Sequence, residues 1–134
     1  MPRKMSDAAL PLVVGMTICE RVVRDEATGM ASLIGVFDQV SGRRLPIRYD
    51  RLHIFVSLVG GHGKKGFSLS CRAPDGSAAF EAKGNALFKG LLGAADINIE
   101  ITDLVFAAGG EYMIAFCCGG QPLASRPLLV TVKE

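Results

Sequence analysis

The sequence predicts an all-β protein, namely a single antiparallel β-sandwich of seven or eight strands with an immunoglobulin-like architecture. Apolar and polar residues alternate through much of the chain, a pattern typical of strands with one face on a core. Turn-forming residues separate these segments at short intervals. The length of 134 residues suits one domain, which we expect at 11–134 after a flexible N-terminus at 1–10.

The N-terminal third predicts a hairpin followed by a central strand. Residues 12–23 alternate, "DEATGM" (25–30) has the composition of a turn, and "SLIGVFDQV" (32–40) predicts the returning strand. Strand structure should lapse in "RRLPIRYDR" (43–51), because proline donates no ladder hydrogen bond. "LHIFVSLVG" (52–60) is apolar on both faces, as in a central strand. The inward face of the first strand is expected to hold Leu12, Val14, Met16, Ile18 and Val22.

The middle of the chain predicts a second hairpin. "GHGKKG" (61–66) has the composition of a flexible loop. The segments "FSLSCRA" (67–73) and "AAFEAKG" (78–84) alternate on either side of "PDGS" (74–77). Proline and glycine suit that turn, because proline presets φ and glycine accepts a positive φ. The expected inward residues are Phe67, Leu69, Cys71, Ala73 and Phe80.

The C-terminal part predicts three more strands. "DINIEIT" (96–102) places three isoleucines on one face, which a helix would scatter around its axis. Gly119-Gly120 is a natural hairpin tip, and "PLLVTV" (127–132) predicts the closing strand. Before that tip, one face of the expected strand carries Tyr112, Ile114, Phe116 and Cys118.

One segment, "NALFKGLLGAA" (85–95), departs from the alternation. Leu87, Phe88, Leu91 and Leu92 recur at helical spacing, which predicts a short helix near 86–93 or an apolar loop across an open end. A lone sandwich would leave this segment partly exposed, and exposed apolar patches usually mark contacts. We therefore expect these four residues to form the interface of a homo-oligomer, with a dimer as the favoured size; an unidentified protein partner is the alternative.

The charge and the apolar runs argue against several partners. A net charge of +2 is too small to indicate nucleic acid or an anionic membrane. The longest apolar run is far below the roughly 20 residues that span a bilayer, and no small-residue cleavage site follows residues 8–14. We expect a cytoplasmic protein with neither nucleic acid nor a membrane as partner.

The four cysteines predict neither a bridge nor a metal site. Adjacent Cys117 and Cys118 point to opposite sides of a strand. Cys71 and Cys118 lie roughly where an immunoglobulin-type bridge would sit, but no tryptophan completes that signature. Since a cytoplasmic protein keeps its thiols reduced, we expect no disulfide. Without a Cys-x-x-Cys pair we expect no zinc site, and no motif indicates a cofactor.

No catalytic constellation is visible, so we expect a binding or assembly module and not an enzyme. A Cys/His hydrolase would need His53 or His62 within hydrogen-bond reach of a partly exposed cysteine. It is the least favoured of three functions. The second is a small-ligand or anion carrier with a pocket at one end of the sandwich, near a basic connection that contains Arg43, Arg44, Arg48 and Arg51.

Several segments together resemble a family of short bacterial proteins known as a domain of unknown function. The resemblance rests on "ICERVVRDEATGMASLIGVFDQV", "PIRYDRLHIFVSL", "PDG" and "GGEYMIAFCCGGQPLASRPLLVTV". It covers most of residues 16–132, and its opening "ICE" and "SLIGVFD" blocks are the most specific part. The family implies a β-sandwich and supplies no activity, substrate or cofactor.

Overall fold

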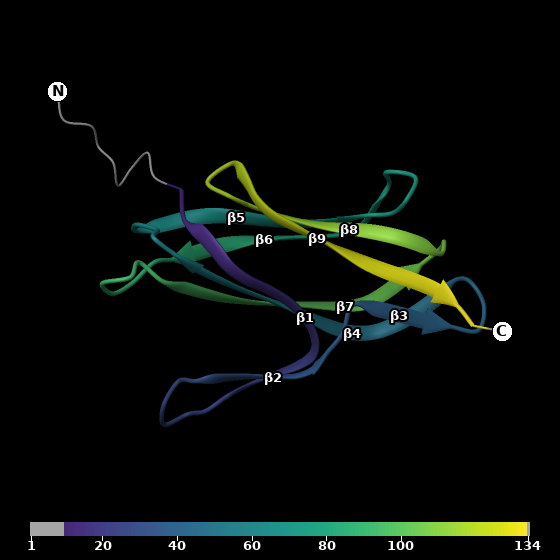
Figure 1. Cartoon of the computed structure of the whole chain (residues 1–134), viewed down its shortest axis with the longest axis horizontal. Helices are drawn as coiled ribbons and strands as arrows, with labels where there is room; N and C mark the ends of the chain where they lie inside the picture. The colour runs from purple at the N-terminus through teal and green to yellow at the C-terminus, as the bar shows by residue number, and fades with distance from the viewer. Residues whose placement is uncertain (1–9, 134) are drawn as a thin grey trace.

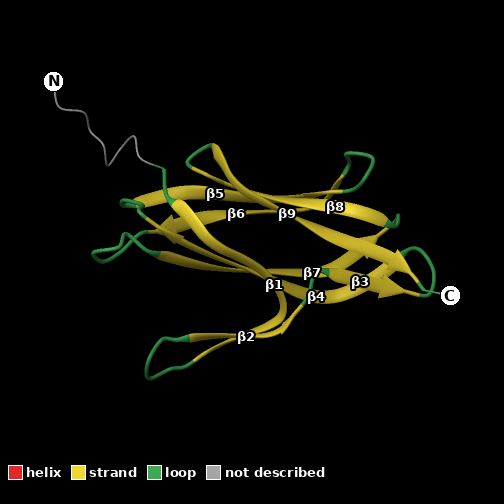
Figure 2. Ribbon diagram, in the orientation of Figure 1, coloured by secondary structure: helices red, strands yellow, loops and turns green. Residues whose placement is uncertain are grey.

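The computed structural model describes residues 10–133, so the expected flexible N-terminus, apart from Leu10, lies outside the described residues. Within this range the chain has nine strands and no helix (Figures 1 and 2). The described part of the chain therefore offers no helix of the length and apolar character needed to cross a bilayer. The strands are β1 (Leu12–Arg24), β2 (Ala31–Val36), β3 (Gln39–Gly42), β4 (Ile47–Val59), β5 (Lys64–Arg72), β6 (Ala78–Leu87), β7 (Ala95–Phe106), β8 (Gly110–Cys118) and β9 (Gln121–Val132).

The strands form two sheets that face one another (Figure 1). The four-stranded sheet has the order β2-β1-β4-β7, and the five-stranded sheet has the order β3-β9-β8-β5-β6. Neighbouring strands are antiparallel except β3 and β9, which pair in parallel. The predicted all-β sandwich is confirmed.

The structure has more strands than the seven or eight predicted, because segment 32–40 is two strands and not one. At Phe37 and Asp38 the chain crosses from the four-stranded to the five-stranded sheet. The Phe37 amide donates to the carbonyl oxygen of Ile18 on β1 (3.0 Å), and the Asp38 carbonyl oxygen accepts from the Leu129 amide on β9 (3.0 Å). Adjacent residues are thus bonded to different sheets.

The core confirms the alternation predicted for the later strands. All three isoleucines of β7 that were expected inward are buried, as are Tyr112, Ile114, Phe116 and Cys118 of β8. The Tyr112 hydroxyl donates to the carbonyl oxygen of Ala108 (2.7 Å), and its ring packs edge-on against Phe106. This local contact has the geometry of the tyrosine corner of immunoglobulin-type domains, so the sandwich shares this feature with them.

The inward face predicted for the first strand is confirmed at Met16 and Ile18 and is wrong at Leu12 and Val14. An irregularity in the pairing with β4 falls between Val13 and Gly15. An extra residue at such a bulge shifts the alternation to the other face. Val13 consequently packs against the core, whereas Leu12 and Val14 are 64% and 57% exposed.

Two other boundaries differ from the prediction. The strand structure lapses over residues 43–46 only, and β4 already begins at Ile47. The short helix expected near 86–93 is wrong, because β6 continues to Leu87 and an antiparallel bridge between Lys89 and Ala94 closes a tight turn.

Candidate functional site

The β6–β7 turn and the β4–β5 loop meet at one end of the sandwich, on the left in Figure 1. Both are short connections, and each supplies backbone groups that the other needs. Such pairing satisfies donors that would otherwise need water. Three backbone hydrogen bonds join them, from the amide of Gly60 to the carbonyl oxygen of Leu92 (2.8 Å), from Gly61 to Gly93 (3.0 Å) and from Phe88 to Gly63 (2.9 Å).

Close packing fixes the position of this turn. Phe88 is only 7% exposed and belongs to the core. A Cβ added at Gly61 would overlap the Phe88 ring, and one added at Gly93 would overlap the Gly61 backbone. Gly93 also has a φ of +57°, which other residues rarely adopt. Glycine at both positions therefore lets the two connections touch.

The turn presents leucines to solvent. Leu91 is fully exposed, Leu92 is 72% exposed and Leu87, at the end of β6, is 53% exposed. We call these three residues the apolar end. Of the four residues predicted as an interface, only the three leucines are exposed, because Phe88 fills the core and is not available for a contact. The prediction for Phe88 as an interface residue is wrong.

Two exposed lysines lie next to the apolar end. Lys64 lies opposite Leu87 in the β5–β6 pairing, and Lys89 stands at the base of the turn. Both are exposed, whereas Lys65 is half-buried. Residues 60–66 and 87–95 contain no aspartate or glutamate, so the end is locally positive near neutral pH.

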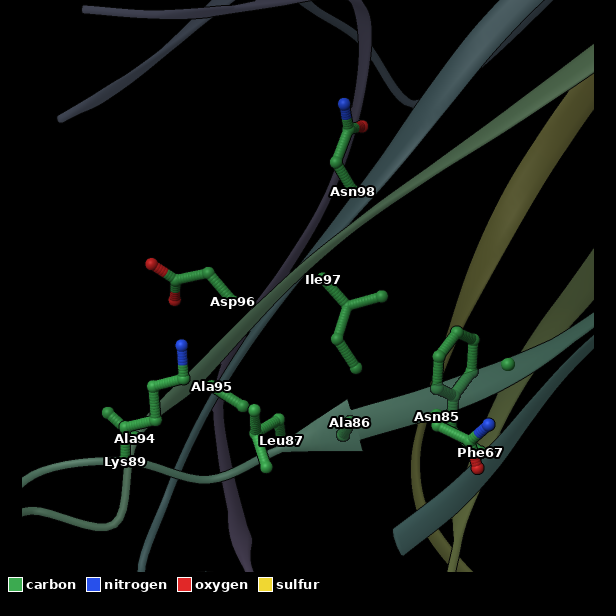
Figure 3. A pocket seen from close by; sticks show the side chains of 11 residues that line it. Phe67, Asn85, Ala86, Leu87, Lys89, Ala94, Ala95, Asp96, Ile97 and Asn98 are labelled. Carbon is green, nitrogen blue, oxygen red and sulfur yellow. The ribbon is translucent and has the colours of Figure 1, made fainter. Parts of the chain in front are cut away.

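A shallow groove of about 520 Å³ runs from the apolar end along the open side between β6 and β7. Phe67, Ala86 and Ile97 form its apolar wall. In Figure 3 the Lys89 amine and the Asp96 carboxylate lie on the side of the groove away from Phe67. The groove is open to solvent, and its lining mixes apolar side chains with a few polar groups.

The four arginines of the predicted basic edge do not form one site. Arg48 and Arg51 line a hollow that also holds the carboxylates of Glu20 and Asp50. Arg51 is further paired with Glu100, its Nε lying 3.2 Å from Oε2. Arg43 lines a separate hollow with Ser41, Gly42 and Lys133, and Arg44 is exposed on the connection between the two.

His53 lies on the outer face of the four-stranded sheet, where it is 8% exposed. Its Nδ1 is hydrogen-bonded to Oδ1 of Asn98 (2.9 Å), and its Nε2 lies 3.7 Å from Oε2 of Glu100. Both ring nitrogens therefore face β7, although the cross-strand neighbour of His53 on the other side is Cys19 of β1. Cys19 is fully buried, and burial raises the pKa of its thiol. This arrangement does not provide the exposed cysteine that a hydrolase needs.

Cys71 and Cys118, the two cysteines considered for a disulfide, lie far apart. Cys71 lies opposite Ile114 and Cys118 opposite Phe67 in the same sheet, so four residues of strand, about 13 Å, lie between them. That distance is too long for a disulfide, and all four thiols are free. Burial raises the pKa of Cys71 to about 12. Burial also raises the pKa of Cys118, against a smaller opposing effect of Lys65.

The sequence pointed to three of the leucines and missed the lysines beside them. The signal that was present is the pair of glycine-flanked segments, "GGHGKKG" and "KGLLG". Each was interpreted alone, the first as a solvated loop and the second as a short helix or an apolar loop. Only the hydrogen bonds between the two connections bring their cations and leucines together.

The fold and these surfaces define an immunoglobulin-like β-sandwich whose most distinctive exposed feature is an apolar end flanked by Lys64 and Lys89. Residues 15–131 match a family of unknown function designated DUF6941, and the chain belongs to this family. The resemblance seen in the sequence is thus confirmed. No curated protein matches the chain in sequence.

Two solved structures are similar over most of the chain. One is the alkylpurine DNA glycosylase AlkC of Pseudomonas fluorescens, bound to DNA with an abasic site analog. It is 11% identical with a TM-score of 0.46, over 87% of this chain and 30% of that one. The other is an immunoglobulin-like protein of Pseudomonas aeruginosa, 17% identical with a TM-score of 0.40, over 91% of this chain and 97% of that one. Neither likeness indicates a function for this chain.

Proposed function

We propose that this protein is a non-catalytic binding module that contacts its partner through the apolar end. The observation that carries the proposal is the full exposure of Leu91 and the 72% exposure of Leu92 in one turn. Solvated turns normally use glycine, proline, asparagine, aspartate or serine. The fold needs the two glycines and Phe88 of this region, but no packing contact requires leucine at the tip.

Burial of these leucines would supply useful binding energy. Covering a leucine side chain is worth about 1.5–3 kcal/mol, and the turn is already fixed by Phe88 and three backbone hydrogen bonds. A preorganised surface loses little conformational entropy on binding. The apolar end therefore has both the chemistry and the rigidity of a contact site.

The carrier alternative has less support. The hollow that Arg48 and Arg51 line also contains Glu20 and Asp50, and these two carboxylates offset the two cations, so little net attraction for an anion is left. The dimer and the cytoplasmic location expected from the sequence stay predictions.

The proposal is tested by the double variant L91S/L92S, studied in protein from gently lysed cells. Gel filtration and ultracentrifugation would show how wild type divides among monomer, larger complex and membrane fraction. We expect wild type to be found largely in a complex or a membrane fraction, and L91S/L92S to run as the free 14.2 kDa chain.

A matched control is M30S/L45S, which removes two other exposed apolar side chains in loops. It should behave as wild type. Identical distributions for wild type and L91S/L92S would contradict the proposed function.

A further inference from the structure

We propose that the partner of the apolar end is the surface of an anionic phospholipid bilayer. Leu91 and Leu92 would enter the interfacial region while the neighbouring lysines contact headgroup phosphates. This inference rests on the proposed function and names its partner. It describes a peripheral contact by two adjoining loops, not a segment that crosses the membrane.

Charge is the first argument. The two segments that form this end contain no carboxylate, and they place the exposed Lys64 and Lys89 beside the leucines, whereas Lys65 lies on the other face, next to Gly119. Asp96, just after the second segment, lies beside Lys89 in the groove. Basic residues close to an anionic bilayer each add about 1 kcal/mol of attraction, a fivefold change in partitioning. Apolar side chains flanked by cations are what such a surface binds.

Shape is the second argument. Leu91 and Leu92 stand at the tip of a turn, where Leu91 is fully exposed and Leu92 is 72% exposed. Three leucine side chains offer far less than the roughly 1,200 Å² that a stable protein interface buries. A bilayer surface needs no matching shape, because the lipids move aside and cover the inserted side chains.

The same features disfavour a second copy at this site. A twofold dimer places the same patch on both sides of the interface. One positive end would then pack against another positive end, and opposed like charges are costly. Whole-chain charge gave the opposite expectation about membranes, because the net value of +2 averages this positive end with acidic residues elsewhere.

The test is cosedimentation of the full chain with vesicles of phosphatidylglycerol and phosphatidylcholine, compared with vesicles of phosphatidylcholine alone. We expect wild type to bind the anionic vesicles and to be released by salt. L91S/L92S should lower the partition coefficient about tenfold or more. K64Q/K89Q should lower it about fivefold for each lysine removed.

Two controls match these variants. M30S/L45S removes exposed apolar side chains elsewhere, and K83Q/K133Q removes two exposed lysines outside the end. Both should bind vesicles as wild type does if the site is local. Circular dichroism and thermal unfolding would show that every variant retains the wild-type fold.

The outcomes separate the inference from the proposed function. Loss of vesicle binding in L91S/L92S and K64Q/K89Q, with both controls unchanged, supports the inference. Wild type that ignores anionic vesicles overturns it. If L91S/L92S then dissolves a dimer or a complex seen by native mass spectrometry, the proposed function stands with a protein partner. If L91S/L92S leaves both the vesicle binding and the native mass unchanged, the proposed function fails as well.

Discussion

The two connections that flank β6 differ in both geometry and chemistry: the β5–β6 turn joins neighbours within one sheet, whereas the β6–β7 turn crosses to the other sheet. The β5–β6 turn satisfies its groups locally, with the Ala73 amide bonded to the Ser77 carbonyl oxygen and the Asp75 carboxylate accepting from the Ser77 amide (2.9 Å) and hydroxyl (2.6 Å). The β6–β7 turn instead bonds to the β4–β5 loop and exposes Leu91 and Leu92. The two turns lie at opposite ends of the sandwich (Figure 1).

The comparison distinguishes residues that the turn geometry requires from residues that it does not require and that are available for a contact. The β5–β6 turn consists only of residues that favour turns, namely Pro74, Asp75, Gly76 and Ser77. The fold alone therefore explains every residue of this connection. In the β6–β7 turn, the glycines and Phe88 account for the geometry, and the leucines remain unaccounted for by the fold. Three substitution experiments test this division of roles.

The largest expected effect comes from Phe88 itself. Phe88→Ala should lower the free energy of unfolding by about 3–5 kcal/mol, because a large buried ring is removed from the core. Leu91→Ala, in the same turn, should change it by at most about 0.5 kcal/mol. Urea unfolding of both variants measures the contrast. Similar losses for both would show that Leu91 packs in the folded state and would break the comparison.

A smaller effect is expected from the glycines. Gly93→Ala should cost about 2–3 kcal/mol, since it combines backbone strain with a collision against Gly61. Gly76→Ala also has a positive φ but meets open space, so strain alone should cost about 1 kcal/mol. Thermal unfolding would rank the two. The reverse order would mean that the β4–β5 loop yields easily, which is incompatible with a preorganised apolar end.

The smallest expected effect is the pH dependence of stability that comes from Asp75. Hydrogen bonds from the Ser77 hydroxyl and amide lower the pKa of Asp75. A carboxyl whose folded pKa is depressed adds stability above its unfolded pKa of about 3.9, and that stability is lost as the pH falls through the folded value. The difference in unfolding midpoint between wild type and Asp75→Ala should therefore shrink on acidification. A difference that stays constant down to about pH 2 would show that the carboxylate charge contributes nothing to the turn.

Much of the fold was predictable because period-two alternation is a local property. Ile97, Ile99 and Ile101 were assigned to the core correctly, since a regular strand alternates without exception. Leu12 and Val14 were assigned wrongly, because the irregularity before Gly15 depends on pairing with β4 and leaves no mark in the alternation. The crossing at Phe37 was missed for the same reason.

The candidate site was less predictable. The spacing of Leu87, Phe88, Leu91 and Leu92 fits a helix, yet these residues divide between the core and solvent. Tertiary contacts decided between two local interpretations that the pattern alone allowed. The proximity of Lys64 to Leu87 follows from the β5–β6 register, which no short segment of sequence specifies.

The position of β9 inside the five-stranded sheet, between β3 and β8, has a consequence for synthesis. Until Gln121–Val132 has emerged from the ribosome, β3 has no neighbour in this sheet and β8 presents a bare backbone edge. Pairing of β3 with β9 joins Gln39 to Leu129, a closure across most of the chain and therefore a slow one. The nascent chain would present first β5 and then β8 as an unpaired strand edge until β9 emerges. We therefore expect its yield in cells to depend on chaperones that cover β8 until the last strand arrives.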